Sequence, residues 1–199
     1  MQTGYSAVLR PAAQAGIRLL EPMVAISELQ DSLPNFPTEI LEEWLFPYAE
    51  SEGWPPAESD DGQLCGRWRY LLGNKPLRFW RALRWEKVQR HISVYDLNAE
   101  CQDVMLKLVL ASVRGETNLY SVSIPNLKMR FDRIVEHIRA TGELPCAPTL
   151  VPERYGLSIV DGNHRMAAYL YCYGYFKLEV EAKLQLRTKE IQEYWIGIP

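Results

Sequence analysis

The sequence predicts an α+β fold, in which a small mixed sheet with flanking helices follows a mainly helical N-terminal extension. The last third of the chain carries most of this prediction, because apolar runs over 146–151 and 157–160 flank a polar turn and indicate paired strands. A helix is expected directly behind the second strand, over 165–173. Ahead of the strands, apolar residues recur at helical spacing over 126–140. Strands and helices in this order build a sheet with helices packed on it.

The bulk composition indicates a globular protein and excludes several kinds of site. Of 199 residues, 47% are hydrophobic and 24% charged, which allows one domain or a small domain with an extension. The net charge of -3 excludes a general polycation, so a nucleic-acid site must be local. The four cysteines form no CxxC pair and the three histidines are isolated, so we expect free thiols in a reducing compartment and no structural zinc.

Two further features of the sequence predict a cytoplasmic protein. The first ten residues lack the basic start and the apolar core of a secretory signal. No uncharged apolar run approaches the roughly 20 residues that cross a bilayer, so we expect no membrane insertion.

Residues 1–90 form the predicted N-terminal extension, which is rich in aromatic side chains. A short helix is expected over 27–33, because the next residue is proline. Thr38 is a suitable N-cap for a second helix over 39–46, and Pro47 is expected to stop or kink that helix.

The sign of the charge changes inside this extension. Eight acidic residues and no basic one lie between Glu39 and Asp61, whereas eight basic residues and one acid lie between Arg67 and Arg90. The basic segment is also aromatic, so it can follow a nucleic-acid backbone and stack on bases. The DNA-binding candidates, which recur every three residues and would spiral around a helix, are Arg78, Arg81, Arg84 and Lys87. The alternative is that the tryptophans are core and the basic residues cover them or pair with the acidic run.

Residues 91–199 form the predicted second domain, in which glycines indicate where helices end. The first expected elements are a strand over 92–97, a helix from Asn98 to about Gly115, a strand-like piece over 118–124 and the helix of 126–140, which Gly142 ends. Gly174 ends the helix of 165–173. A strand over 178–184 and a terminal helix over 188–195 are expected after it.

The turn Asp161-Gly162-Asn163-His164-Arg165 carries the chemistry of this domain. It places a helix N-terminus at the carboxyl end of a strand, where backbone N–H groups and the helix dipole favour a bound anion such as phosphate. Asp161 is a hard oxygen donor suited to magnesium or to general-base work, and Gly162 lets a ligand approach the backbone. Asn163 can cap the helix, while His164 and Arg165 bring two phosphate donors to its start. The structural alternative is a local cap, with Arg165 paired to a surface acid.

Strand, turn, strand, the Asp-Gly-Asn-His-Arg turn, an alanine-containing helix and a further strand resemble the core of the ParB/sulfiredoxin superfamily. The resemblance covers about residues 120–186 and implies a small mixed sheet that holds nucleotide phosphates at this turn. The nucleotide-binding residues that it implies are Gly162, Asn163, His164, Arg165, Arg130 and, as weaker candidates, Arg133 and His137.

Two departures separate the chain from well-known branches of the superfamily. Sulfiredoxins carry their catalytic cysteine just before the His-Arg pair, where this chain has Asn163, so sulfinic acid repair is not expected. Chromosome-partitioning members continue into a helix-turn-helix DNA reader, for which about a dozen residues remain here. The motif is closer to members that act as small-molecule kinases, nucleases or nucleotide hydrolases.

Some plasmid-encoded members are short stand-alone proteins with ATPase and DNase activity, and they inhibit fertility by blocking conjugative DNA transfer through a type IV secretion system. The chain resembles them in size, in its motif and in having no appended helix-turn-helix. The resemblance therefore implies a metal-dependent ATPase and DNase. Its expected ligands and partners are ATP or another nucleotide, Mg²⁺ or another divalent cation, DNA and a protein of the conjugation machinery.

Under this hypothesis the catalytic residues are Asp161, His164 and Arg165, and Asp161 holds the metal. Candidates for a second carboxylate are Glu153, Glu86 and Asp96. Two alternatives stay open. One is a kinase for an amino acid or another small hydroxyl compound, and the other is a module that binds nucleotide or DNA without turnover.

Overall fold

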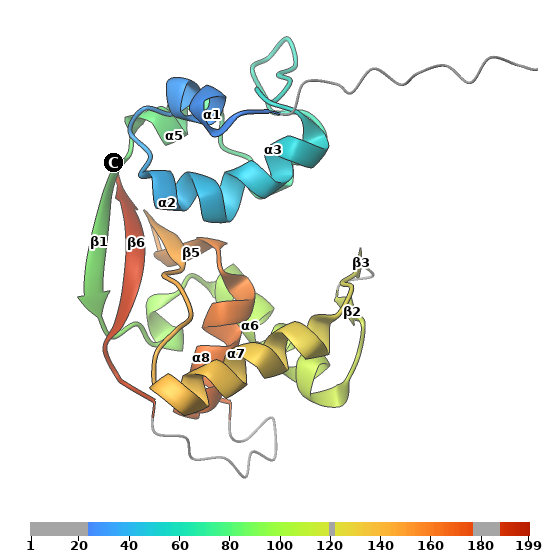
Figure 1. The fold of residues 1–199 in the computed structure, drawn as a ribbon, viewed down its shortest axis with the longest axis vertical. Helices are drawn as coiled ribbons and strands as arrows, with labels where there is room; N and C mark the ends of the chain where they lie inside the picture. The colour runs from blue at the N-terminus through green and yellow to red at the C-terminus, as the bar shows by residue number, and fades with distance from the viewer. Residues whose placement is uncertain (1–23, 120–121, 177–187) are drawn as a thin grey trace, which may run out of the picture.

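The computed structural model describes residues 24–119, 122–176 and 188–199 (Figure 1). Within them the chain forms a small four-stranded mixed sheet with flanking helices, which confirms the predicted α+β class. Figure 1 shows the N-terminal helices, drawn in blue to cyan, on one side of the sheet and the later helices on the other.

The N-terminal extension is mainly helical, as predicted. Its elements are α1 (Ile26–Ser32), α2 (Thr38–Ile40), the π-helical turn η1 (Leu41–Leu45), α3 (Phe46–Glu52), α4 (Trp68–Leu71) and α5 (Leu77–Ala82). Two details of the prediction are wrong. Thr38 is the first helical residue rather than the cap, because Pro37 takes the N-cap position. Of the two alternatives predicted for Pro47, a stop or a kink, the stop is wrong, because Pro47 lies in the first turn of α3, after a π turn in which the Phe46 N–H bonds to the Leu41 carbonyl.

The rest of the chain supplies the sheet and three long helices. The elements are β1 (Arg84–Arg90), the 3₁₀ turn η2 (Val94–Asp96), α6 (Ala99–Arg114), β2 (Asn118–Leu119), β3 (Val122–Ser123), α7 (Leu127–Thr141), β4 (Thr149–Glu153), β5 (Gly156–Asp161), α8 (Asn163–Tyr173) and β6 (Gln192–Ile198). The sheet order is β1-β6-β4-β5, in which β4 and β6 are parallel and the other two pairs antiparallel. β2 and β3 form a separate hairpin.

Both faces of the four-stranded sheet are buried, each in a different core. Successive side chains on a strand point to opposite faces, so each strand contributes to both cores. On β4, Leu150 packs with α6, α7 and α8, whereas Val151 packs with the N-terminal helices. On β5, Ile159 packs in the core that contains Leu150, and Val160 packs in the core that contains Val151. The sheet is therefore the middle of three layers, and β1 joins it from before the predicted boundary at residue 90.

The terminal helix predicted over 188–195 is wrong, because β6 occupies that part of the chain and lies between β1 and β4. Burial alternates along β6, with Gln192, Tyr194 and Ile196 buried and Glu193 exposed. Pairing on both edges of this strand outweighs its local helix preference. The strand predicted over 178–184 lies outside the described residues.

The strand predicted over 92–97 is also wrong, because η2 forms there. The Asp96 carboxylate accepts hydrogen bonds from the backbone N–H and the hydroxyl of Ser93, both at 2.7 Å. This local capping arrangement competes successfully with extended backbone.

In the second domain, the predicted start of a helix at Asn98 and the predicted helix ends at Gly115, Gly142 and Gly174 are confirmed, whereas α8 begins at Asn163, before the predicted residue 165. Asn98 caps α6, since its side-chain oxygen accepts from the Cys101 N–H at 2.8 Å. Gly115, Gly142 and Gly174 end α6, α7 and α8 in the left-handed conformation. Among the described residues, no helix has both the length and the apolar character to cross a membrane.

The packing of Trp80 predicts a large loss of stability when its ring is removed. Trp80 is fully buried and its ring lies edge-on to that of Trp44, with the centroids 5.3 Å apart. Trp80→Ala should lower the free energy of unfolding by about 3–5 kcal/mol through lost burial and a cavity. Tyr155→Ala, at a side chain that is 76% exposed, is the control and should change it by no more than about 0.5 kcal/mol. Urea unfolding measures both, and a Trp80→Ala midpoint equal to the wild-type one would contradict this packing.

Candidate functional site

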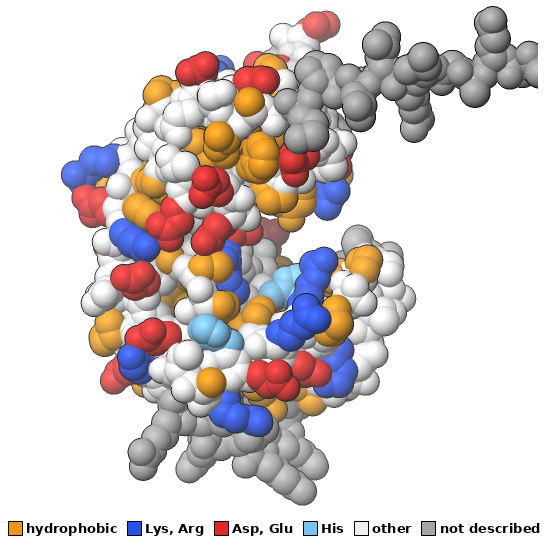
Figure 2. Space-filling model, viewed as in Figure 1, with side chains coloured by type: hydrophobic (Ala, Val, Ile, Leu, Met, Phe, Trp, Pro, Cys, Tyr) orange, Lys and Arg blue, Asp and Glu red, His pale blue; other side chains and the backbone are white. Residues whose placement is uncertain are grey.

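A cleft of about 590 Å³ opens between the N-terminal helices and the predicted turn. Figure 2 shows this hollow, with Lys and Arg side chains along its lower lip and a histidine beside them. The N-terminal side contributes Glu43, Trp44, Tyr48, Arg67, Tyr70, Leu71 and Gly73. The opposite side contributes Arg130 of α7, the end of β5 and the first residues of α8, from Ser158 to Arg165. The structure therefore brings five predicted site residues and Arg130 to one cleft.

The turn itself is a direct passage from strand to helix. Asp161 is the last residue of β5, Gly162 is the N-cap with φ of 90°, and α8 begins at Asn163. The N-cap residue is a glycine, which has no side chain to cap the helix, and Asn163 is the first helical residue, so the prediction that Asn163 caps it is wrong. A helix that starts without a side-chain cap leaves first-turn N–H groups for another acceptor.

Arg165 is the most heavily engaged side chain of the cleft. One terminal nitrogen, Nη2, donates to the Asp161 carboxylate four residues earlier. The other, Nη1, donates to the Glu43 carboxylate at 3.2 Å and contacts the Cys146 sulfur. The Arg165 side chain is only 14% exposed, so these contacts are poorly screened by water.

Gly162 is the residue that lets Arg165 reach back to Asp161. A Cβ atom at this position would lie 2.9 Å from Arg165 Nε and 3.0 Å from Pro148 Cβ. The left-handed conformation is also strained for any residue with a side chain. Two separate constraints therefore require glycine at the start of α8.

Burial controls the charge state of the turn. It raises the pKa of the Asp161 carboxyl, and the Arg165 cation and a backbone hydrogen bond from Gly162 oppose that rise. Burial also lowers the pKa of His164, and the cations of Arg130 and Arg165 lower it further. His164 is therefore a neutral imidazole at pH 7, with a buried Nε2 that has no hydrogen-bond partner among the described residues.

Of the three residues of α7 that were predicted to bind nucleotide, the structure places one, Arg130, in the lining of the cleft. Arg133 and His137 are not among the residues that line the cleft. Arg130 lines it and is exposed, and its guanidinium has no ion-pair or hydrogen-bond partner within the described part of the chain. Arg130 is thus the cation of α7 that a ligand in the cleft can reach.

The four DNA-binding candidates lie away from the cleft lining, on α5 and β1. The helical spiral predicted for them is wrong, because Arg84 and Lys87 lie on a strand. Arg81 donates to the Ser32 carbonyl at 2.7 Å, and Lys87 pairs with Glu39 at 3.0 Å. The remaining candidates are exposed: Arg78 has no such partner among the described residues and Arg84 pairs with Glu86.

The tryptophans of the same segment are core residues. Trp68, Trp80 and Trp85 are each at most 9% exposed. Lys87–Glu39 and Arg67–Glu52, at 3.0 Å each, pair the basic segment with the acidic one before it. The alternative to DNA binding predicted core tryptophans and basic residues that pair with the acidic run. The structure has this arrangement for the tryptophans and for Arg67 and Lys87.

The sequence missed the second carboxylate of the cleft. Glu153 hydrogen-bonds to Asn98 at 3.0 Å, and the three candidates named for this role, Glu153, Glu86 and Asp96, are absent from the cleft lining. Glu43, which the sequence presents only as an acid early in a helix, lies there instead. The described residues hold no group of three or more His, Cys, Asp and Glu side chains arranged to bind a metal.

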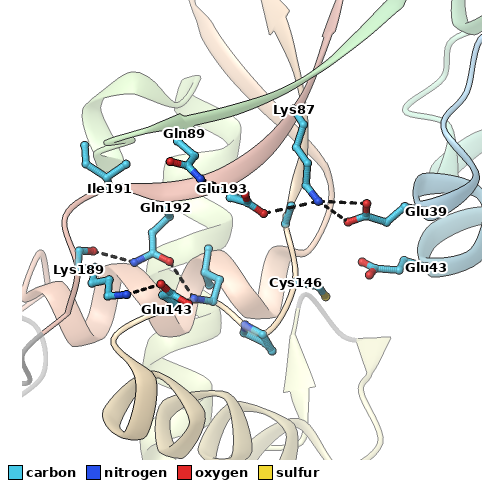
Figure 3. Close-up of a pocket in the computed structure, with 13 residues that line it drawn as sticks. Glu39, Glu43, Lys87, Gln89, Glu143, Cys146, Lys189, Ile191, Gln192 and Glu193 are labelled. Atoms are coloured by element: carbon cyan, nitrogen blue, oxygen red, sulfur yellow. Dashed lines mark hydrogen bonds and ion pairs between the residues drawn. The ribbon is translucent and has the colours of Figure 1, made fainter.

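A second cavity, of about 670 Å³, lies on the other side of Glu43 (Figure 3). Both lysines of its lining are already paired with acids: Lys87 pairs with Glu39, and Lys189 pairs with Glu143. A phosphate there would have to displace both pairs. We therefore take the cleft at the turn as the candidate site.

Comparison with known proteins adds no relative to this picture, because no family model, curated protein or solved structure matches the chain. The superfamily resemblance stays a prediction.

The two constraints on Gly162 can be separated by a matched pair of substitutions. Gly162→Ala should cost about 2–4 kcal/mol of unfolding free energy, because it adds a contact with Arg165 to backbone strain of about 1–2 kcal/mol. Gly62→Ala, at φ of 76° with open space around the new Cβ, should show the strain alone. Equal losses in urea unfolding would mean that Arg165 does not lie against Gly162.

The lowered pKa of His164 predicts a loss of stability in acid. The unfolded chain takes up the proton near the ordinary value of 6.5, whereas the folded protein resists it until a lower pH. This contribution to stability is present above pH 6.5 and is lost as the pH falls below it. His164→Gln should therefore flatten the pH dependence of thermal unfolding between pH 7.5 and about 5.5 relative to wild type. An unchanged profile would contradict a buried neutral imidazole.

Proposed function

We propose that the cleft binds a nucleotide by its phosphates and hydrolyses it, as a phosphoryl-transfer enzyme of the ParB/sulfiredoxin type. One observation carries the proposal: the glycine-capped N-terminus of α8, neutral His164, and Arg130, whose guanidinium has no partner among the described residues, line one cleft. Phosphate oxygens satisfy all three, because the helix N-terminus and Arg130 offer donors with positive charge and the imidazole can donate as well.

The remaining residues of the turn have roles that follow from their contacts. Arg165 is the second cation of the site, and Asp161 orients it from the adjacent strand. His164 is a candidate general base near neutral pH, because an uncharged imidazole can take a proton from an attacking water. Asp161 is the other candidate base, once Arg165 turns towards a ligand.

Magnesium is compatible with the donors of this cleft. The ion is commonly held by one or two carboxylates together with the phosphates of its substrate, and Asp161 and Glu43 are the carboxylates that line the cleft. When bound, magnesium neutralises charge that develops on the phosphoryl group.

DNA is the second substrate that we propose, because its backbone offers the same phosphate chemistry. Arg67 and Tyr70 lie on the N-terminal side of the cleft, and Tyr70 is 77% exposed. The exposed Tyr70 ring suits stacking on an unpaired base, and Arg67, which pairs with Glu52, is a cation on the same side of the cleft. A nuclease of this kind that acts on transferred DNA would block conjugation through a type IV secretion system.

A second candidate function is binding without turnover. The observation that favours it is the Asp161–Arg165 pair, which holds the proposed metal ligand and base in an ion pair. A protein that kept this pair with nucleotide bound would sense the nucleotide rather than consume it.

The test compares two arginines on the same helix. Arg130→Ala should weaken ATP binding by roughly 10- to 100-fold, because a charge-assisted contact contributes about 1.5–3 kcal/mol. Arg133→Ala, one turn further along α7 and outside the cleft lining, is the matched control and should bind like wild type. Calorimetry measures binding, and phosphate release with magnesium measures hydrolysis in the presence and absence of single-stranded DNA.

The outcomes separate the candidates. Hydrolysis and DNA cleavage that both disappear in Arg165→Ala and Asp161→Ala support the enzyme. Nucleotide that is bound but never consumed supports the binding module. Equal effects of Arg130→Ala and Arg133→Ala would contradict the cleft as the nucleotide site.

A further inference from the structure

The Nη1 atom of Arg165 has no N–H group left for a phosphate in the arrangement described above, because its two N–H groups already donate to Glu43 and to the Cys146 sulfur. Asp161 lies four residues before Arg165 in the sequence and, at 23% exposure, is more deeply buried than Glu43, the other carboxylate that pairs with Arg165. Glu43 is 34% exposed and approaches from the opposite side of the cleft, 122 residues away in the chain. A phosphate oxygen can reach Arg165 most easily where Glu43 now lies.

Glu43 is held at this position by its neighbours. It belongs to the π-helical turn η1, whose residues Leu41, Trp44 and Leu45 are all at most 1% exposed. Figure 3 shows Glu39 and Glu43 projecting from this helix towards the sheet, with the Cys146 sulfur below Glu43. Glu39 is committed to Lys87 at 3.0 Å, so of these two acids Glu43 is the one directed at Arg165.

We propose that Glu43 occupies the phosphate position on Arg165, so that a phosphate binds by displacing it and separating η1 from α8 at this point. The inference rests on the proposed phosphate site and adds a competitor to it. A guanidinium pairs with carboxylate and with phosphate through the same two-pronged geometry, so the two anions exclude each other there. Displacement is feasible because a third of the Glu43 side chain already meets solvent, which can hydrate the released carboxylate.

Competition with Glu43 makes binding at Arg165 depend on the charge of the incoming anion. A phosphate carrying two negative charges gains more from Arg165 and Arg130 than a carboxylate does, whereas a singly charged anion gains little over Glu43. The site thus favours a terminal phosphate, as in a nucleoside diphosphate or triphosphate. Removing the Glu43 charge removes the competitor and leaves the hydrogen-bonding shape of the side chain.

The experiment measures binding of inorganic pyrophosphate by calorimetry in EDTA, so that a metal-ligand role of Glu43 does not enter. Glu43→Gln should bind at least about fivefold more tightly than wild type, which corresponds to the loss of one partly exposed charge-assisted contact. Glu42→Gln is the matched control, because Glu42 is exposed, lies outside the cleft lining and has no ion pair in the described part of the chain. Its affinity should equal the wild-type value.

A double variant tests whether the effect passes through Arg165. In the Arg165→Ala background, Glu43→Gln should produce no gain, since the shared position no longer exists. Overturning results are an unchanged affinity in Glu43→Gln, an equal gain in Glu42→Gln, or a gain that persists without Arg165. Thermal unfolding of each variant accompanies the titrations, because a purely structural Glu43 would change stability and leave affinity alone.

The proposed function and this inference can fail separately. If wild type binds pyrophosphate and ATP, loses both in Arg130→Ala, and Glu43→Gln equals wild type, only the competitor is wrong. If neither wild type nor Glu43→Gln binds either ligand, both the proposed phosphate site and the proposed role of Glu43 as a competitor are wrong.

Discussion

The rest of this structure depends on the burial of both faces of a four-stranded sheet. A sheet of this size with alternating apolar side chains cannot be stable with one face in water, because Val151, Val160 and Trp195 would then be exposed. The N-terminal helices cover that face and so are part of the fold rather than an appendage. Their position creates the cleft, since the edge where they meet β5 and α8 is also the edge where the turn lies.

The turn concentrates charge in a place that is only partly open to solvent. Asp161, Glu43 and the Cys146 thiol surround one guanidinium, and burial raises the pKa of Cys146 to about 11, so the thiol is neutral. Two carboxylates therefore share one cation. A buried pair that is already satisfied exchanges partners more readily than it dissociates, because leaving either charge unpaired is costly. This makes the site responsive to anions that can take over one side of Arg165.

Local patterns in the sequence predicted what local physics decides. The β4–β5 hairpin, the helix ends at Gly115, Gly142 and Gly174 and the strand-to-helix turn follow from side-chain preferences within a few residues. The strand β6 was not predictable in this way, since its residues pair with β4 residues 46 positions earlier and with β1 residues 102 to 114 positions earlier in the chain. Glu43 gave no signal for the same reason: its partner is 122 residues away, and a glutamate early in a helix has a sufficient local explanation.

The central place of β6 has a consequence for how the molecule forms. Among the strands that the structure describes, β1 pairs with β6 alone, so residues 84–90 lack a partner from this sheet until residues 192–198 have been synthesised. The N-terminal helices can collapse early around their own tryptophans, but the surface that they later place on the sheet stays uncovered meanwhile. Closure of the sheet is thus a late, long-range event, which slows folding and leaves an apolar surface open to chaperones and to other chains.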